Sequence, residues 1–271
     1  MAQESIIDAS KPSPGRMYDY FLGGHHNFEV DRKAGDQLLS LLPFVSKFVR
    51  MQRWTLQDLA TILTVERGYD VIIDYASGLP TADNIHTKVP PGTTVIYSDY
   101  DSVIVEYAKE ILGKENNHKV NYFHVDAGRP EDLLNQPDVK QTLGDRRKVA
   151  FVYWGVSGFL SDEALSHAAQ VLYEWAAPGS CLAFNAHVGA DTEHFTPAVQ
   201  QTVALYKAMG TTLYIRKPDD YLRILKPWEL DSQGWVPLLK WHGFDQSELG
   251  QEDESAFGPL GGGLGGFFVK P

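Results

Sequence analysis

The stretch from Asp70 to His86, DVIIDYASGLPTADNIH, constrains the fold of this chain more than any other. It opens with Val71-Ile72-Ile73, a short β-branched run that is typical of a strand covered on both faces of a sheet. Asp74 follows where that strand would end, and a turn of small residues leads to Pro80. Proline suits the first position of a helix, because the N–H that it lacks would be unpaired there. Strand, tight turn and helix start together predict the ligand-side unit of an open α/β sheet.

Acidic residues stand where the first two predicted strands end. Asp74 in the turn disfavours a pyrophosphate and favours a cationic or hydroxyl-bearing ligand. Asp99 follows the next predicted strand, residues 93–97, at ~20 residues beyond the turn, where an acid usually binds ribose hydroxyls. An ionised carboxylate accepts two hydrogen bonds and therefore suits a vicinal diol. Either aspartate alone could be a helix cap or a turn former, but the pair in these two places favours a nucleoside site.

Two segments carry a resemblance to a known family. They are the early PSPGRMYDYFLGGHHNFEVDR and the later DYASGLPTADNIH. Together they resemble a family of S-adenosylmethionine-dependent methyltransferases long catalogued as a domain of unknown function, and the similarity extends to Asp99, Asp126 and the closing VKP. Two positions depart from the family pattern: Ala76 replaces the first motif glycine, and Asp83 stands where a small residue is common. The methyl group of Ala76 can weaken cofactor binding without forbidding it.

The resemblance implies an α/β fold with a Rossmann-like class I methyltransferase sheet, mostly parallel with an antiparallel closing strand. S-adenosylmethionine (SAM) would be the cofactor and S-adenosylhomocysteine the product. Residues 1–67 would form an N-terminal arm and helical cap, and residues 68–271 the SAM-binding domain. Taken alone, the aromatic residues of the arm could be core filler and Gly23-Gly24 a turn; the resemblance instead implies that the arm folds over the cofactor.

The predicted cofactor contacts come from the arm, the first turn and the ends of the next strands. In this type of methyltransferase an acid at Asp126 contacts the adenine amino group, although spacing alone fits an N-cap equally well. His187 ends the fifth predicted strand and is the candidate catalytic residue, as a general base or by orienting the acceptor, with a structural role as the alternative. The predicted cofactor-binding residues are Arg16, Tyr20, Gly23, Gly24, His25, Asp74, Ala76, Gly78, Thr81, Asn84, Asp99, Tyr100, Asp126, Ala127 and Trp154.

The remaining chain alternates between strand and helix patterns. This alternation predicts a largely parallel sheet with right-handed crossovers. Helices are expected at residues 31–42, 47–67, from Pro80, at 102–112, from Pro130, at 163–176, 195–209 and 218–225. Later strands are expected at residues 120–126, 148–154 and 181–187, with WVPLLKW and GGFFVKP as closing strands.

Composition narrows the function. A net charge of −11 argues against nucleic acid, whose binding depends on neutralising phosphates with Lys and Arg. No window approaches the ~20 apolar residues of a membrane span, and the N-terminus lacks the pattern of a signal peptide. Cys181 is the only cysteine, which excludes an intramolecular disulfide and favours the cytoplasm. The histidines lack ligand spacing, and no CxxC or HExxH occurs, so no metal site is expected.

Three functions remain in competition. The first is in-line methyl transfer from SAM to a small-molecule acceptor. The second is a nicotinamide-dependent oxidoreductase; against it, Pro80 replaces the third glycine of a dinucleotide turn and no YxxxK pair of the short-chain type exists. The third is a SAM- or S-adenosylhomocysteine-binding protein without turnover, which Ala76 and the lack of an obvious base keep open. The identity of the acceptor and the oligomeric state are left open by the sequence.

Overall fold

Apolar β-branched runs form the central strands of the computed structural model, which describes residues 10–81, 83–114, 120–187, 196–244, 250 and 262–271. Five strands pair in parallel: β1 (Val71–Tyr75), β2 (Thr94–Asp99), β3 (Val120–His124), β4 (Ala150–Tyr153) and β5 (Cys181–Ala186). Three more strands join one edge through antiparallel pairs: β8 (Leu264–Val269) pairs with β5, and both β6 (Glu229–Leu230) and β7 (Val236–Pro237) pair with β8. The order in the described sheet is β3-β2-β1-β4-β5-β8-β6, with β7 also paired to β8. The predicted mostly parallel sheet with an antiparallel closing strand is confirmed.

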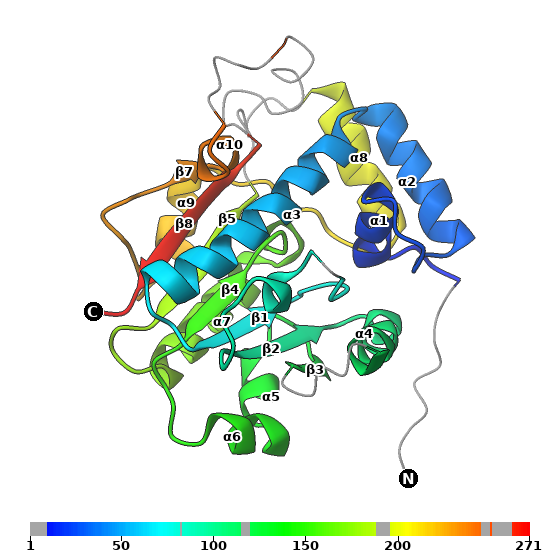
Figure 1. Cartoon of the computed structure of the whole chain (residues 1–271). Coiled ribbons are helices and arrows are strands. Elements are labelled where there is room, and N and C mark those ends of the chain that lie inside the picture. Colours follow the sequence, from blue (N-terminus) through cyan, green and yellow to red (C-terminus); the bar gives the residue numbers. More distant parts are fainter. Residues whose placement is uncertain (1–9, 82, 115–119, 188–195, 245–249, 251–261) are drawn as a thin grey trace.

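Helices cover both faces of this sheet (Figure 1). Side chains of a strand alternate between faces, so Ile72 packs in one apolar cluster while Val71 and Ile73 pack in another. The face of Ile72 is covered by α3 (Val45–Thr61), α4 (Ser102–Lys114) and α10 (Leu238–Trp241). The opposite face is covered by α5 (Pro130–Leu134), α6 (Pro137–Leu143), α7 (Asp162–Trp175) and α9 (Pro218–Ile224).

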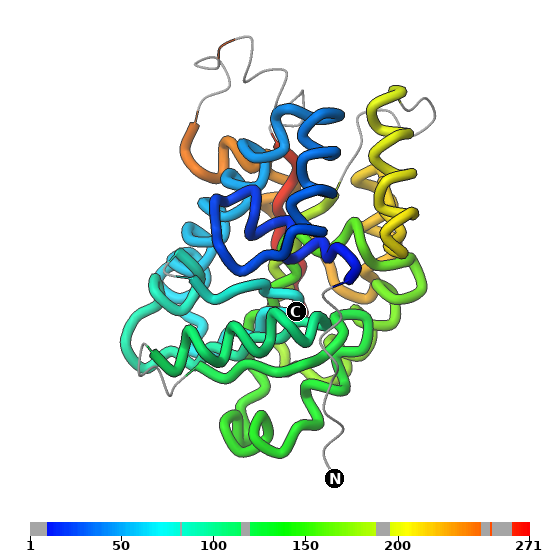
Figure 2. The backbone as a smooth tube through the Cα atoms, turned by 90° about the vertical axis from the view of Figure 1, so that its right-hand side faces the viewer, coloured from blue at the N-terminus to red at the C-terminus, as the bar shows by residue number. Residues whose placement is uncertain are grey.

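The N-terminal arm packs on a helix from the second half of the chain. A third apolar cluster joins α1 (Pro14–Phe21), α2 (Glu29–Leu41) and the start of α3 to α8 (Pro197–Ala208). Figures 1 and 2 both show α2 beside α8. Met17 and Phe21 are buried in this cluster. Part of the arm therefore belongs to the hydrophobic core.

The connection between β1 and β2 differs from the prediction. No α-helix begins at Pro80; the described part of this connection holds one short 3₁₀ turn, η2 (Ile85–Thr87). Asn84 accounts for the difference, because its side chain accepts a hydrogen bond from the Ile85 N–H at 2.7 Å and donates to the Leu79 carbonyl at 3.2 Å. Such local side-chain bonds compete with helix formation. The turn after β1 therefore lacks the helix N-terminus that a phosphate site would use.

Two further elements differ from expectation. The LLKW part of WVPLLKW is helical as α10, and only Val236–Pro237 pairs as a strand. The predicted helix 47–67 is α3 followed by one π-helical turn, η1 (Ile62–Glu66). Gly68 ends it with a φ of +72°, as expected of a glycine stop.

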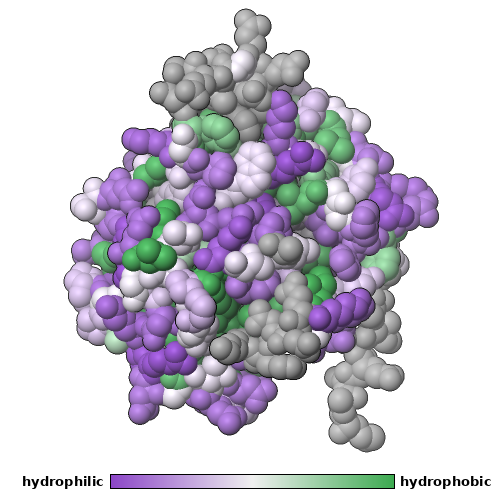
Figure 3. All heavy atoms as spheres, in the orientation of Figure 1, coloured by the Kyte–Doolittle hydropathy of each residue, from purple (hydrophilic) through white to green (hydrophobic). Residues whose placement is uncertain are grey.

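The visible surface in Figure 3 is mainly hydrophilic, with small apolar areas between polar side chains. None of the helices in the described ranges is long and apolar enough to span a membrane.

Candidate functional site

A cavity of about 370 Å³ lies at the carboxyl ends of β1, β2 and β4. Residues of α1 and α3 complete its lining. The sheet contributes side chains and backbone that follow each of these strands and β3. The helices contribute an aromatic ring, an amide and a guanidinium. The lining residues are Pro14, Gly15, Tyr18, Gln52, Arg53, Leu56, Ala76, Ser77, Gly78, Asp99, Tyr100, Asp126, Ala127, Trp154, Gly155, Val156, Phe159, Leu160, Gly210, Thr211, Thr212 and Tyr214.

The turn after β1 holds a residue type that its backbone does not favour. Ala76 has a φ of +54° and Gly78 a φ of +63°, both in the left-handed region. Glycine adopts that region freely, whereas a side chain there costs about 1 kcal/mol. The turn is fixed to β2, because the Ser77 N–H donates to the Ser98 carbonyl at 2.9 Å. The motif glycine that Ala76 replaces thus has a conformational reason besides close approach of a ligand.

Asp99 joins this turn to the end of β2. One carboxylate oxygen accepts from the Gly78 N–H at 3.1 Å, and the other accepts from the Asp101 N–H at 2.9 Å. Burial raises the pKa of Asp99 to about 6; the bond from the Asp101 N–H opposes this shift, and the charge of Asp101 adds to it. The Tyr100 N–H also donates to this carboxylate, which has about four lone-pair sites and lines the cavity, so it keeps acceptor capacity for a ligand diol.

Asp126 and Ala127 form the next part of the cavity wall. The Asp126 carboxylate accepts from the Gly128 N–H at 2.8 Å, while the N-cap position of α5 belongs to Arg129. Asp126 therefore shapes the turn before the helix and does not cap the helix itself. The Ala127 carbonyl accepts from the Tyr153 hydroxyl at 2.7 Å, which fixes this turn to β4.

Asp74 is buried behind the turn and does not line the cavity. One of its carboxylate oxygens, Oδ2, has no hydrogen-bond partner among the described residues. Burial raises the pKa of Asp74 well above its ordinary value; the charge of Arg53 opposes this shift and that of Asp99 adds to it. Successive side chains of a strand point to opposite faces of the sheet, and Ile73 lies on the face away from α3. The side chain of Asp74 therefore lies on the face that α3 covers.

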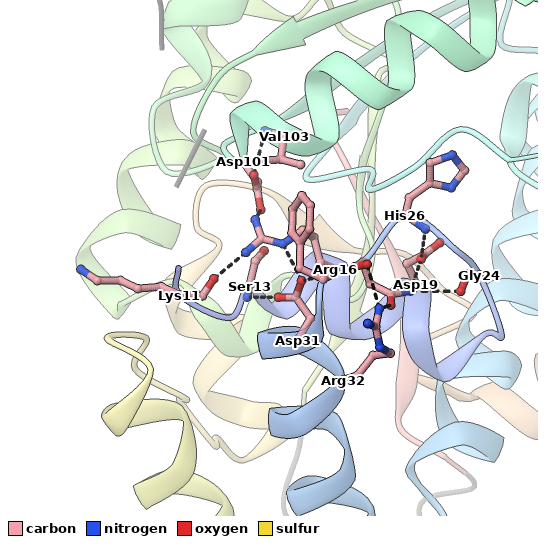
Figure 4. Close-up of polar contacts among 12 residues, drawn as sticks. Lys11, Ser13, Arg16, Asp19, Gly24, His26, Asp31, Arg32, Asp101 and Val103 are labelled. Atoms are coloured by element: carbon pink, nitrogen blue, oxygen red, sulfur yellow. Dashed lines mark hydrogen bonds and ion pairs between the residues drawn. The ribbon is translucent and has the colours of Figure 1, made fainter. Parts of the chain in front are cut away.

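The arm contributes to the cavity through residues other than the predicted ones. Pro14, Gly15 and Tyr18 line it, whereas Arg16, Tyr20, Gly23, Gly24 and His25 do not. Figure 4 shows Arg16 bridging three segments: its guanidinium donates to Asp31 at 2.9 Å, to Asp101 at 2.8 Å and to the Lys11 carbonyl at 2.6 Å. The side chain of Arg16 therefore ties α1 to α2 and to the start of α4.

The paired glycines have a local explanation. Gly23 has a φ of +83° just beyond α1. A side chain on Gly24 would place its Cβ 2.0 Å from Asp19 Oδ1. The other oxygen of that carboxylate, Oδ2, accepts from the His26 N–H at 2.9 Å and the Asn27 amide at 2.8 Å (Figure 4). The positive φ of Gly23 and the close approach of Asp19 to Gly24 explain both glycines without a ligand.

His187 and two residues of the first crossover also lie outside the cavity lining. Thr81 donates to Asp83 at 2.6 Å, and Asn84 makes the turn contacts described above. The ring of His187 packs against Gly158, where an added Cβ would lie 2.9 Å from its Cγ. Burial and the charge of Arg216 lower the pKa of His187 to about 4, so the ring is neutral near pH 7.

Helix α3 supplies two polar lining residues that sequence reasoning missed. Gln52 and Arg53 are both buried, on the stripe that also carries Val49 and Leu56. Gln52 donates to the Asn185 side chain at 3.0 Å, which links α3 to β5. Two polar residues within an apolar helical stripe were the available signal. Among the residues after β4, Trp154, Gly155 and Phe159 line the cavity, and Ser157 does not.

The sheet order and the acid-lined cavity at its carboxyl edge define a Rossmann-like α/β domain with a small-molecule site. Residues 1–265 match the family model described as S-adenosyl methyltransferase, and the chain belongs to this family. It is therefore a SAM-dependent methyltransferase with SAM as its cofactor, as the resemblance predicts. This finding sets the nicotinamide alternative aside.

Solved structures agree with this assignment. A protein of Thermobifida fusca YX that is assigned as a methyltransferase is 28% identical, with a TM-score of 0.83 and 97% of each chain covered. A DUF574 family protein from Streptomyces avermitilis MA-4680 is 25% identical, with a TM-score of 0.82, covering 98% of this chain and 100% of the other. Magnesium protoporphyrin IX methyltransferase from Synechocystis PCC 6803 with bound SAM, 13% identical with a TM-score of 0.54 over 98% and 95% of the chains, shows the fold alone. No curated protein matches the chain.

Proposed function

We propose that the chain transfers the methyl group of SAM to a small-molecule acceptor, with both ligands held in the cavity at the carboxyl ends of β1, β2 and β4. The observation that carries this proposal is the pair of carboxylates at that edge, Asp99 and Asp126, which line a cavity of about 370 Å³. A cavity of this size lies within the range of small-molecule sites.

The residues present fit the cofactor in its nucleoside half. Asp99, whose carboxylate keeps acceptor capacity, would accept hydrogen bonds from the ribose hydroxyls, and Asp126 with Ala127 would lie at the adenine. The turn at Ala76 and Gly78, together with Trp154, would flank the remaining part of the cofactor. The predicted contacts of Arg16, Tyr20, Gly23, Gly24, His25, Asp74, Thr81 and Asn84 find no such support, because none of these residues lines the cavity.

Bound SAM supplies an electrophilic methyl group on a sulfonium. The contribution of the chain would be to hold the acceptor in line with it and to exclude water, which can account for a large share of the rate. The acceptor would contact a different part of the cavity lining, which we call the acceptor wall. It consists of Phe159, after β4, and of Thr212 and Tyr214, in the loop after α8. His187 lies outside the cavity lining, which favours catalysis by positioning over general-base catalysis by this residue.

A titration and a turnover assay test the proposal. Calorimetry should detect binding of SAM and S-adenosylhomocysteine, with NAD as the negative control. Release of S-adenosylhomocysteine in the presence of candidate small acceptors should follow, and it should fall in Asp99→Asn. Binding of SAM without release across a broad acceptor set would favour the alternative of a binding protein without turnover.

Three coarser expectations accompany this function as proposals. The net charge of −11 supports a small molecule over nucleic acid as acceptor. The single cysteine, Cys181, which is buried, supports a cytoplasmic location. A boundary near residue 67 between the helical cap and the α/β domain is supported by the third apolar cluster, although α8 of the second part joins that cluster.

A further inference from the structure

Arg53 is a buried cation that the protein itself leaves poorly partnered. The side chain lies on α3, is 4% exposed and lines the cavity. Its Nε and Nη1 atoms have no hydrogen-bond partner among the described residues. Its one ion pair in that part of the chain joins Nε to Asp83 Oδ2 at 4.0 Å, and the Asp83 side chain is 43% exposed.

This arrangement is costly unless a ligand completes it. A buried charge is stable only when it is paired and its hydrogen-bonding capacity is filled. Asp83 does not do this, since its nearest oxygen lies 4.0 Å from Nε, beyond hydrogen-bond distance. Tyr18 lies beside the guanidinium, with its ring centroid 5.4 Å from the guanidinium carbon and a hydrogen bond between the two side chains, yet Nε and Nη1 stay without partners among the described residues. Each of these N–H groups can donate a charge-assisted hydrogen bond to a carboxylate oxygen.

The neighbourhood of Arg53 indicates which carboxylate would fit. Arg53 lies near enough to Asp74 for their charges to interact, and Asp74 Oδ2 is itself without a hydrogen-bond partner. Asp74 does not line the cavity, however, so a ligand there can complete the hydrogen bonds of Arg53 and not those of Asp74. Arg53 and the turn after β1 both line the cavity, so a carboxylate bound beside that turn would lie near the guanidinium.

We infer that Arg53 binds the α-carboxylate of the methionine part of SAM and selects ligands that carry this group. The inference rests on the proposed placement of the cofactor. A carboxylate on the methyl acceptor is the other chemical source of such a partner. The methionine part is favoured because Arg53 contacts Asp83, in the same segment as the cofactor turn, and the proposed acceptor wall at Phe159 and Tyr214 belongs to other segments.

Calorimetry with three ligands tests the inference on the full-length protein. The ligands are SAM, decarboxylated SAM and 5′-methylthioadenosine, which lacks the whole amino-acid part. Wild-type protein should bind SAM at least tenfold more tightly than decarboxylated SAM. Arg53→Met should weaken SAM about 30-fold, the scale of a lost charge-assisted contact, and change decarboxylated SAM less than threefold. Arg50→Met, an exposed position on the same helix, is the matched control and should change neither ligand.

The outcomes separate the inference from the function on which it rests. Unchanged SAM affinity in a folded Arg53→Met variant overturns the inference, and so does an equal loss for SAM and decarboxylated SAM. A rise confined to the KM of the acceptor also overturns it. If the variant does not fold, the wild-type comparison still decides, since equal affinity for SAM and decarboxylated SAM refutes carboxylate recognition. If wild-type protein binds neither SAM nor 5′-methylthioadenosine, the proposed site itself is wrong.

Discussion

Cofactor binding is predicted to weaken about tenfold when the pH falls from 7 to 5, because Asp99 must be ionised to accept two ribose hydroxyls. Burial raises the pKa of this carboxyl to about 6. At pH 7 about nine in ten unliganded molecules would carry the ionised form, and at pH 5 about one in ten. A tenfold loss corresponds to about 1.4 kcal/mol of binding free energy.

The sign of the effect follows from linkage. The pKa of Asp99 in the folded chain lies above the ordinary value of 3.8, so folding favours the protonated form. The stability of the unliganded fold that depends on Asp99 is present below pH ~4 and is lost as the pH rises towards ~6. The affinity for a diol has the opposite pH dependence, because the diol binds the ionised carboxylate. It should therefore increase as the pH rises through the pKa of Asp99.

The assay is calorimetry with 5′-methylthioadenosine, because this ligand keeps the ribose and has no ammonium or carboxylate of its own. Asp99→Asn is the control: it should bind more weakly at pH 7 and show no slope between pH 5 and 7. Affinity of the wild type that is constant over this range would refute the reasoning. An equal slope in Asp99→Asn would assign the titration to another group near the turn, of which Asp74, whose pKa burial also raises, is the candidate.

Three further changes test the local geometry. Ala76→Gly should leave SAM affinity equal or improved in calorimetry and the melting temperature unchanged or raised, because it relieves about 1 kcal/mol of backbone strain at φ +54°; a large loss of binding would show that the methyl group packs productively. Arg16→Met should lower the free energy of unfolding in urea by about 3–5 kcal/mol, since it leaves Asp31 buried without its partner. At temperatures where the variant is folded, its SAM affinity should change less than threefold, and the exposed Lys33→Met is the control for both measurements. His187→Ala should reduce kcat less than tenfold, and a loss of about 10²-fold or more would instead identify a general base.

The strands and the two motif acids could be predicted because their signals are local. β-branched runs such as Val71-Ile72-Ile73 are sufficient to place a strand, and Asp99 follows its strand at a fixed distance from the turn. The missing first crossover helix shows the limit of this approach. Pro80 is compatible with a helix start, but the hydrogen bonds of Asn84 to Leu79 and Ile85 hold a different turn.

The role of the arm depends on contacts that sequence spacing does not reveal. Arg16 pairs with Asp31, 15 residues away, and with Asp101, 85 residues away. An arginine within a segment that resembles a cofactor-binding family suggests a ligand contact, and only its contacts with Asp31, Asp101 and the Lys11 carbonyl show that its donors are already used. The prediction that the arm covers the site is compatible with the structure, through Pro14, Gly15 and Tyr18.

Helix α3 shows how a polar residue on an apolar stripe can be interpreted. The helix leads into the amino end of β1, so its second half packs on the sheet and its first half lies towards the carboxyl ends of the strands. Leu59 and Leu63 occupy the part over the sheet, where a charge would have no partner. Gln52 and Arg53 occupy the part at the cavity, where a ligand can complete the hydrogen bonds of Arg53. A charged residue at an otherwise apolar position is therefore informative when topology brings that end of the helix to the ligand edge of the sheet.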